Sequence, residues 1–66
     1  MNRDELRAEI ARKNVPKGKL AEELGLSRAG LALKLSGTNE FRETEIKALI
    51  RVLSLTPEDV DRIFLR

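Results

Sequence analysis

The sequence contains no cysteine and no histidine, and these absences exclude much of the chemistry that small proteins perform. Without cysteine, the chain has neither a disulfide framework nor a cysteine-based zinc site. Without histidine, it lacks the side chain that most often acts as a general base or binds a metal ion. Two pairs of neighbouring acids are present, Glu22 with Glu23 and Asp59 with Asp61. No group nearby would organise a substrate, so we expect these acids to be solvated, and we predict no catalytic residue, metal site or cofactor.

Aromatic and β-branched residues, which strands favour, are scarce, and there is no tryptophan or tyrosine. Long apolar runs are missing as well. The first ten residues, MNRDELRAEI, contain no apolar run long enough for a signal peptide, and no segment approaches the length of a membrane span. The composition therefore predicts an all-α protein of the cytoplasm.

A chain of 66 residues accommodates one small domain. A core of this size typically leaves only about 3–5 kcal/mol of stability, so we expect tight helix packing or oligomerisation to contribute. The net charge of +2 is small, but positive charge is concentrated in the middle of the chain. The charged residues of segment 14–37 are Lys17, Lys19, Arg28 and Lys34 against Glu22 and Glu23.

The residues at helix ends predict where the first two helices begin and end. Asn2 and Glu5 are the expected capping pair of the first helix. The second helix begins around Pro16 or Lys17, because proline suits the first helical turn. It ends at Gly25, because glycine adopts a positive φ without steric penalty. The residues expected to be buried in these helices are Leu6, Ile10, Leu20, Ala21 and Leu24.

Three further helices are predicted in the second half of the chain. Ser27 is the expected N-cap of the third helix, residues 28–35, which is followed by the loop SGTN at 36–39. The fourth begins near Glu43. The fifth begins with Thr56 as N-cap and Pro57 in the first helical position. The residues expected to pack inward here are Phe41, Ile46, Leu49, Ile50, Leu53, Val60, Ile63 and Phe64.

The segment GLSRAGLALKLSG, residues 25–37, has leucine at every second position, which is typical of a half-buried strand. The only partner strand available would be VLSL at 52–55, and that segment continues a helical pattern from the fourth helix. A helix instead places Leu31 and Leu35 together on the buried face. Leu33 then lies about 200° around the helix from Leu31, at about 100° per residue, and we expect it to be exposed.

Two helices joined by LGLS, with alanine in the first and glycine at the turn, form a helix-turn-helix pattern. The stretch KLAEELGLSRAGLALKLSG resembles the phage repressor and Cro family, also called the XRE-type helix-turn-helix family. FRETEIKALIRVLSLTPEDVDRIFL resembles the two helices that follow the motif in small phage members. The resemblance covers nearly the whole chain. It implies a single five-helix DNA-binding domain over residues 1–66 that regulates transcription.

The resemblance also implies which residues meet double-stranded DNA. The third helix enters the major groove, and the base-reading positions of the family fall on Ser27, Arg28, Ala29, Ala32 and Leu33. The phosphate-contacting positions fall on Lys17 and Lys19 and on Thr38, Asn39 and Arg42 of the loop TNEFR. Such a protein is expected in the cytoplasm, associated with the nucleoid when it is bound to DNA.

Two departures from the family pattern predict weakly selective binding. The second helix usually opens with threonine and glutamine, whereas this chain has Pro16 and Lys17 followed by the poor helix former Gly18. The outward face of the third helix is mostly small and apolar, which leaves Arg28 as its only strong donor to base edges. Phosphate contacts should therefore dominate DNA binding.

Each of these residues also has an alternative role. Leu33 would contact a thymine methyl group, join a protein interface, or simply be an exposed apolar residue. In the alternative to DNA contacts, Lys17 and Lys19 are simply solvated charges on the surface, and Arg28 pairs with a glutamate of the preceding helix. The alternative function is a protein-interaction module, resembling an antirepressor or antitoxin, that binds its partner through the helix-turn-helix face.

The last helix carries more apolar residues than one inward stripe requires. We expect Leu65 to remain exposed, with Phe64 shared between the core and the surface, and both to pair across a two-fold axis. So small a patch predicts a weak homodimer that forms chiefly on DNA.

Overall fold

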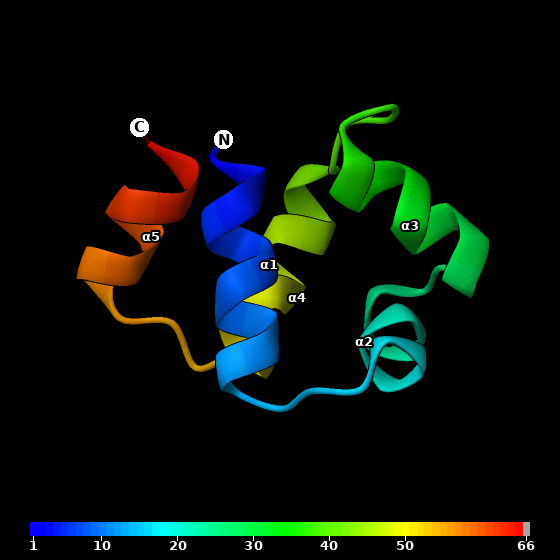
Figure 1. The fold of residues 1–66 in the computed structure, drawn as a ribbon, viewed down its shortest axis with the longest axis horizontal. Coiled ribbons are helices and arrows are strands. Elements are labelled where there is room, and N and C mark those ends of the chain that lie inside the picture. The colour runs from blue at the N-terminus through cyan, green and yellow to red at the C-terminus, as the bar shows by residue number, and fades with distance from the viewer. Residues whose placement is uncertain (66) are drawn as a thin grey trace.

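Residues 1–65 are described by a computed structural model, and they form five α-helices and no strand. The helices are α1 (Arg3–Arg12), α2 (Lys17–Leu24), α3 (Arg28–Ser36), α4 (Glu43–Val52) and α5 (Pro57–Phe64). In Figure 1, α1 and α5 lie beside each other on one side, α2 and α3 lie on the other, and α4 lies behind α1. The predicted all-α domain of five helices is confirmed, and α3 extends one residue beyond its expected end.

The helix ends form as their residues predict. The side chains of Asn2, Ser27 and Thr56 accept hydrogen bonds from backbone N–H groups in the first turns of α1, α3 and α5, at 3.1, 2.9 and 3.2 Å. Each bond satisfies a donor that a helix N-terminus would otherwise leave unpaired. Gly25 has φ 71° and ends α2 in the left-handed conformation.

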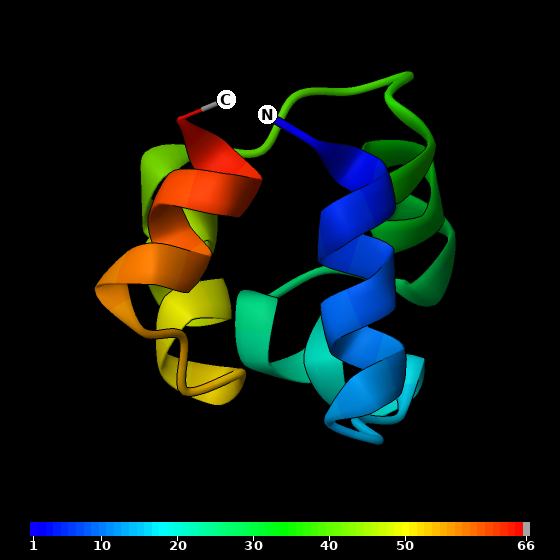
Figure 2. The same ribbon diagram turned by 60° about the vertical axis from the view of Figure 1, so that its left-hand side comes forward.

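The core lies between the helices and consists mainly of leucine. Its buried apolar residues are Leu6, Ile10, Leu20, Ala21, Leu24, Leu31, Leu35, Phe41, Leu49, Leu53 and Ile63. The helix pairs that pack most closely are α2 with α3 and α4, and α1 with α3 and α5. Figure 2 shows α1 standing between α5 and α3. None of the helices in the described part of the chain is both long enough and apolar enough to cross a membrane.

Two residues that were expected to be buried, Ile50 and Val60, are only partly buried and lie outside the set packed against the core. Among the other expected residues, Ile46 and Phe64 are partly buried but do pack against the core. The reason is geometric. The fully buried stripe of α4 is narrow and runs through Leu49, while short α5 buries only Ile63 completely.

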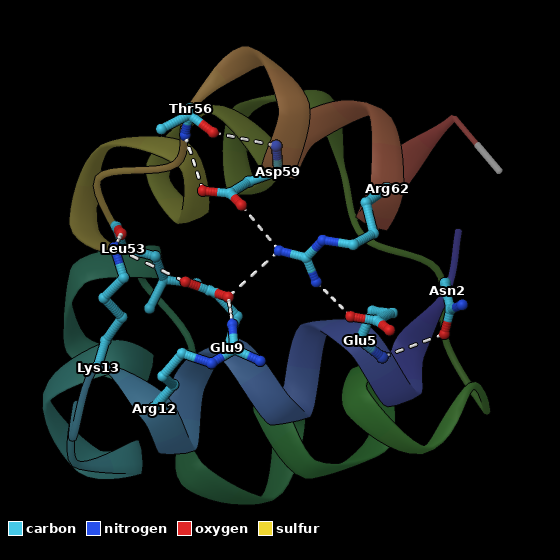
Figure 3. Close-up of polar contacts among 9 residues, drawn as sticks. All are labelled: Asn2, Glu5, Glu9, Arg12, Lys13, Leu53, Thr56, Asp59 and Arg62. Atoms are coloured by element: carbon cyan, nitrogen blue, oxygen red, sulfur yellow. Dashed lines mark hydrogen bonds and ion pairs between the residues drawn. The ribbon is translucent and has the colours of Figure 1, made fainter.

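A charged network that the sequence did not predict joins α1 to α5 (Figure 3). The guanidinium of Arg62 on α5 contacts Glu5 and, at 3.3 Å, Glu9 of α1, and it pairs with Asp59 at 2.8 Å. Glu9 is almost completely buried, with 2% of its surface exposed, and it also accepts a hydrogen bond from Arg12. Paired cations are what allow a carboxylate to be buried at this position.

The same network perturbs the pKa values of its members. The backbone N–H of Thr56 and then the guanidinium of Arg62 donate to Asp59, and together they lower the pKa of this carboxyl from 3.8 to about 2. The hydrogen bonds to Asp59 and Glu5 raise the pKa of Arg62 above its ordinary value. The backbone adds a further tie, because the N–H of Asn2 donates to the carbonyl of Ile63 at 2.6 Å. These contacts hold α5 against α1 and the residue that caps it.

The left-handed conformation at the end of α2 predicts the effect of replacing Gly25. Apart from its two neighbours in the chain, no residue has an atom within 4 Å of a Cβ built at this position, so the cost of a side chain comes from its backbone conformation. Gly25→Ala should lower the free energy of unfolding by about 1 kcal/mol. Gly25→Asn should cost less, because asparagine tolerates the left-handed region. Urea unfolding of the two variants measures both effects, and equal stability of wild type and Gly25→Ala would contradict this account of the turn.

Candidate nucleic-acid interface

The α2–turn–α3 unit consists of two short helices joined by the three residues 25–27. Ala21 is 2% exposed, and its small side chain allows α3 to pack closely on α2. The turn is fixed by Gly25 and by a hydrogen bond of 2.8 Å from the N–H of Leu26 to the carbonyl of Ala21. The predicted orientation of α3 is confirmed, because Leu31 and Leu35 are buried whereas Leu33 is 45% exposed. The alternation of leucines in this segment therefore belongs to a helix.

The outward face of α3 carries most of the residues at the expected base-reading positions. Its exposed residues are Arg28, Ala29, Ala32, Leu33 and Ser36. Ser27 is exposed as well, but its hydroxyl oxygen already accepts the capping hydrogen bond from Gly30. This face therefore offers methyl groups and one guanidinium, and few donors or acceptors for base edges.

The lysines and arginines of residues 1–65 fall into two groups, those with a carboxylate partner and those without one. Eight lysine and arginine side chains of residues 1–65 lie within ion-pair distance of a carboxylate: Arg3, Arg7, Arg12, Lys13, Lys34, Lys47, Arg51 and Arg62. The cations of this range that form no ion pair are Lys17, Lys19, Arg28 and Arg42, and all four are exposed. All four belong to the residues that were expected to contact DNA.

The alternative for Arg28, an ion pair with a glutamate of α2, does not form. Glu23 instead pairs with Arg51 of α4, with Nη1 and Oε1 3.2 Å apart. The guanidinium of Arg28 therefore remains available to an anion from outside the chain.

The loop after α3 folds against the end of that helix. The backbone N–H groups of Thr38 and Asn39 both donate to the carbonyl of Leu33, at 3.0 and 3.2 Å. The hydroxyls of Ser36 and Thr38 lie 3.0 Å apart and share a hydrogen bond. Thr38, Asn39 and Arg42 are all exposed, so the loop presents its polar groups beside α3.

Two arginines of α1 hold the C-terminal end of α3, and sequence reasoning missed both. Nε of Arg3 donates to the carbonyl of Lys34 at 3.0 Å, and Nη1 of Arg7 donates to the carbonyl of Leu35 at 2.6 Å. The last carbonyls of a helix have no partner within the helix and attract cations. The four-residue spacing of Arg3 and Arg7, which puts them on one face of α1, is the only signal in the sequence.

A buried ion pair joins α3 to α4. Nζ of Lys34 lies 2.6 and 2.8 Å from the two carboxylate oxygens of Glu45, and both residues are at least nine-tenths buried. Burial alone would raise the pKa of Glu45, but hydrogen bonds from the backbone N–H of Arg42 and from Lys34 hold that pKa below its ordinary value. The carboxylate stays ionised and ties the middle of the molecule to the candidate interface.

A groove of about 210 Å³ runs along the side of α3. Its lining residues come from three helices: Arg7, Lys17, Arg28, Leu31, Ala32, Leu35 and Ser36. One of these lining residues, Lys17, begins α2, which has no side-chain cap and no acidic residue in its first turn. A helix N-terminus of this kind is favourable to an anion.

The expected dimer residues stand at the C-terminal end of α5, and α5 lies on the opposite side of the molecule from α3 (Figure 1). Leu65 is 73% exposed, as expected, and Phe64 is partly buried against the core. The beginning of the chain is tied to α5 here, and Met1 adds a further partly exposed apolar side chain, 37% of its surface being accessible. The patch is small and apolar.

Comparison of the chain with protein-family models, with curated proteins and with solved structures found no match. The candidate interface therefore rests on the residues and the geometry described above.

The buried ion pair predicts a strong effect of removing one partner. Lys34→Met would leave the Glu45 carboxylate buried without its cation and should lower the free energy of unfolding by about 3 kcal/mol. Adding Glu45→Gln, which removes the charge but keeps an acceptor for the N–H of Arg42, should recover part of that loss. Urea unfolding of both single variants and the double variant gives the coupling energy. Additive effects would show that the two charges do not depend on each other.

Proposed function

We propose that this protein is a DNA-binding transcriptional regulator of the helix-turn-helix type, with α3 in the major groove of double-stranded DNA. The observation that carries the proposal is the position of the four cations without ion pairs. Lys17 and Lys19 lie at the start of α2, Arg28 at the start of α3 and Arg42 at the end of the following loop. Elsewhere in residues 1–65, lysines and arginines are neutralised by carboxylates, so attraction for a polyanion is concentrated around α3.

The shape and polarity of the outward face support contacts with DNA bases that are few and mainly apolar. An α-helix fits the major groove, and the exposed side chains of Ala29, Ala32 and Leu33 are suited to contact with thymine methyl groups. Such contacts discriminate weakly compared with bidentate hydrogen bonds. We therefore expect weakly specific binding in which phosphate contacts supply most of the affinity.

The phosphate contacts come from both ends of the helix-turn-helix unit. On one side are Lys17 and Lys19 of α2, and on the other are Thr38, Asn39 and Arg42 of the loop. Because α3 lies between these two groups along the chain, contacts on both sides would fix its orientation in the groove.

The apolar character of the same face also supports a second candidate, a protein-interaction module. Leu33 is 45% exposed and lies among small residues, as it would in a face that packs against another protein. The two candidates differ in their dependence on salt, because binding to duplex DNA releases counterions and weakens steeply as salt is added. Failure to bind random duplex DNA at low salt would favour the protein-interaction module.

A two-fold dimer would let one protein contact two half-sites about 34 Å apart. The domain is 28 Å long, and α5 and α3 lie at opposite sides of it in Figure 1, so pairing at the α5 end is compatible with such a span. Exposed Leu65, with a contribution from Phe64, would form the contact.

The small area of this patch predicts weak self-association. Sedimentation of the free protein at micromolar concentration should show mostly monomer, with dimers appearing when duplex DNA is added. Leu65→Lys should prevent the DNA-dependent dimer without unfolding the domain. A tight dimer in the absence of DNA that is unaffected by Leu65→Lys would contradict the proposed interface.

Replacement of Lys17 tests the proposed DNA contact. Lys17→Ala should weaken binding to all duplex sequences alike and reduce the slope of log affinity against log salt by about 0.9, the loss of one phosphate contact. Lys47→Ala removes the same charge from an exposed lysine that already pairs with Glu43 at 3.4 Å, and it should change the slope little. Fluorescence anisotropy with a labelled duplex measures both.

Selection of bound sequences from a random duplex library tests the regulator function itself. Weak enrichment of a two-fold symmetric site is the expected outcome. Equal salt slopes for Lys17→Ala and Lys47→Ala would contradict the proposed contact, and a wild-type protein that binds no duplex at low salt would contradict the function.

A further inference from the structure

The guanidinium of Arg28 occupies the space that a side chain at position 18 would fill. A Cβ built on Gly18 would lie 2.9 Å from both Cζ and Nε of Arg28, and closer still to Nη2. Contacts of this length are shorter than real Cβ atoms make, so Arg28 adopts this position only because residue 18 is glycine. The side chain thus folds back from the start of α3 onto the first turn of α2.

This position turns Arg28 away from the outward tip of α3. Its guanidinium lines the groove shared with Lys17 and Arg7 and forms no ion pair with a carboxylate of residues 1–65. Of the three cations in this groove, Arg7 is occupied by Asp4 and by the carbonyl of Leu35. Lys17 and Arg28 remain, and these two cations from different helices line the same groove.

We infer that Gly18 is a positioning residue that holds Arg28 beside Lys17, where the guanidinium binds a DNA phosphate instead of reading a base edge. The inference rests on the proposed function. A planar guanidinium binds a phosphate through two parallel hydrogen bonds, and Lys17 adds a second positive charge. With Arg28 on the DNA backbone, the outward face retains only Ser27, Ser36 and apolar side chains, so weak base selectivity follows from Gly18.

The conformation of Arg28 also predicts that Gly18→Ala weakens phosphate binding without lowering the stability of the domain. Alanine favours the helix more than glycine does, and the atoms it displaces are the far end of a flexible side chain. The variant should therefore be at least as stable as the wild type in urea. A loss of phosphate binding in this variant cannot then be attributed to unfolding.

The experiment is a double-mutant cycle read by duplex binding across salt concentrations. Wild type, Gly18→Ala, Arg28→Ala and the double variant are titrated with a labelled random-sequence duplex, and with duplexes that differ at single base pairs. We expect Gly18→Ala and Arg28→Ala each to reduce the salt slope by about 0.9, and the double variant to lose no more than either one. Base preference should change little in Arg28→Ala.

The outcomes distinguish this inference from the function on which it rests. If the wild type binds no duplex at low salt, both fail. If it binds, and Gly18→Ala keeps the wild-type slope, Gly18 does not position Arg28. If it binds, and Arg28→Ala keeps the slope but loses preference at one base pair, Arg28 reads a base. Either of the last two results overturns the inference and leaves the DNA-binding function standing.

Discussion

The buried ion pair between Lys34 and Glu45 is the interaction on which the position of α3 most depends. α3 is nine residues long and contains Gly30, so its own helix propensity is modest. Two leucines attach it to the core, but apolar contacts alone do not fix the rotation of so short a helix. The Lys34 ammonium does so, because moving it away would leave an ionised carboxylate buried without its cation. The hydrogen bonds from Arg3 and Arg7 then hold the last turn.

The distribution of surface charge is also a consequence of the small core. The described chain places carboxylates beside most of its cations, and the network around Arg62 closes α5 onto α1. These ion pairs neutralise positive charge that would otherwise be spread over the surface. The cations of residues 1–65 that form no ion pair lie at the starts of α2 and α3 and at the end of the loop, and all of them are exposed. A net charge of +2 therefore understates the local attraction for a polyanion.

Local signals in the sequence predicted the helices and the orientation of α3, because caps, glycine turns and apolar spacing act over one or two turns. Ser27, Gly25 and Leu33 are examples, since each was placed correctly from its neighbours alone. Long-range pairs were not predictable in this way. Nothing in the pattern around Lys34 indicates that a residue eleven positions later neutralises it, since its place on α3 reads as an ordinary exposed lysine.

In the candidate site, too, local signals predict some features and long-range contacts determine the others. Its exposed cations could be predicted from the motif, but the direction of Arg28 could not, because it depends on the missing side chain of Gly18 across the turn. The partial exposure of Ile50 and Val60 likewise depends on how the helices pack, and not on their own spacing. Apolar residues with the same helical spacing can form either a wide or a narrow buried stripe.

The central claim is that the face formed by α3, the start of α2 and the loop at 38–42 binds duplex DNA. Titration of the isotopically labelled protein with a short random-sequence duplex at low salt, followed by amide chemical shifts, tests it most directly. The account predicts shifts at residues 17–19, 27–36 and 38–42, with further shifts at Phe64 and Leu65 where DNA-bound copies pair, and reversal of all of these shifts by added salt. Shifts centred on α5, or none at all, would contradict it.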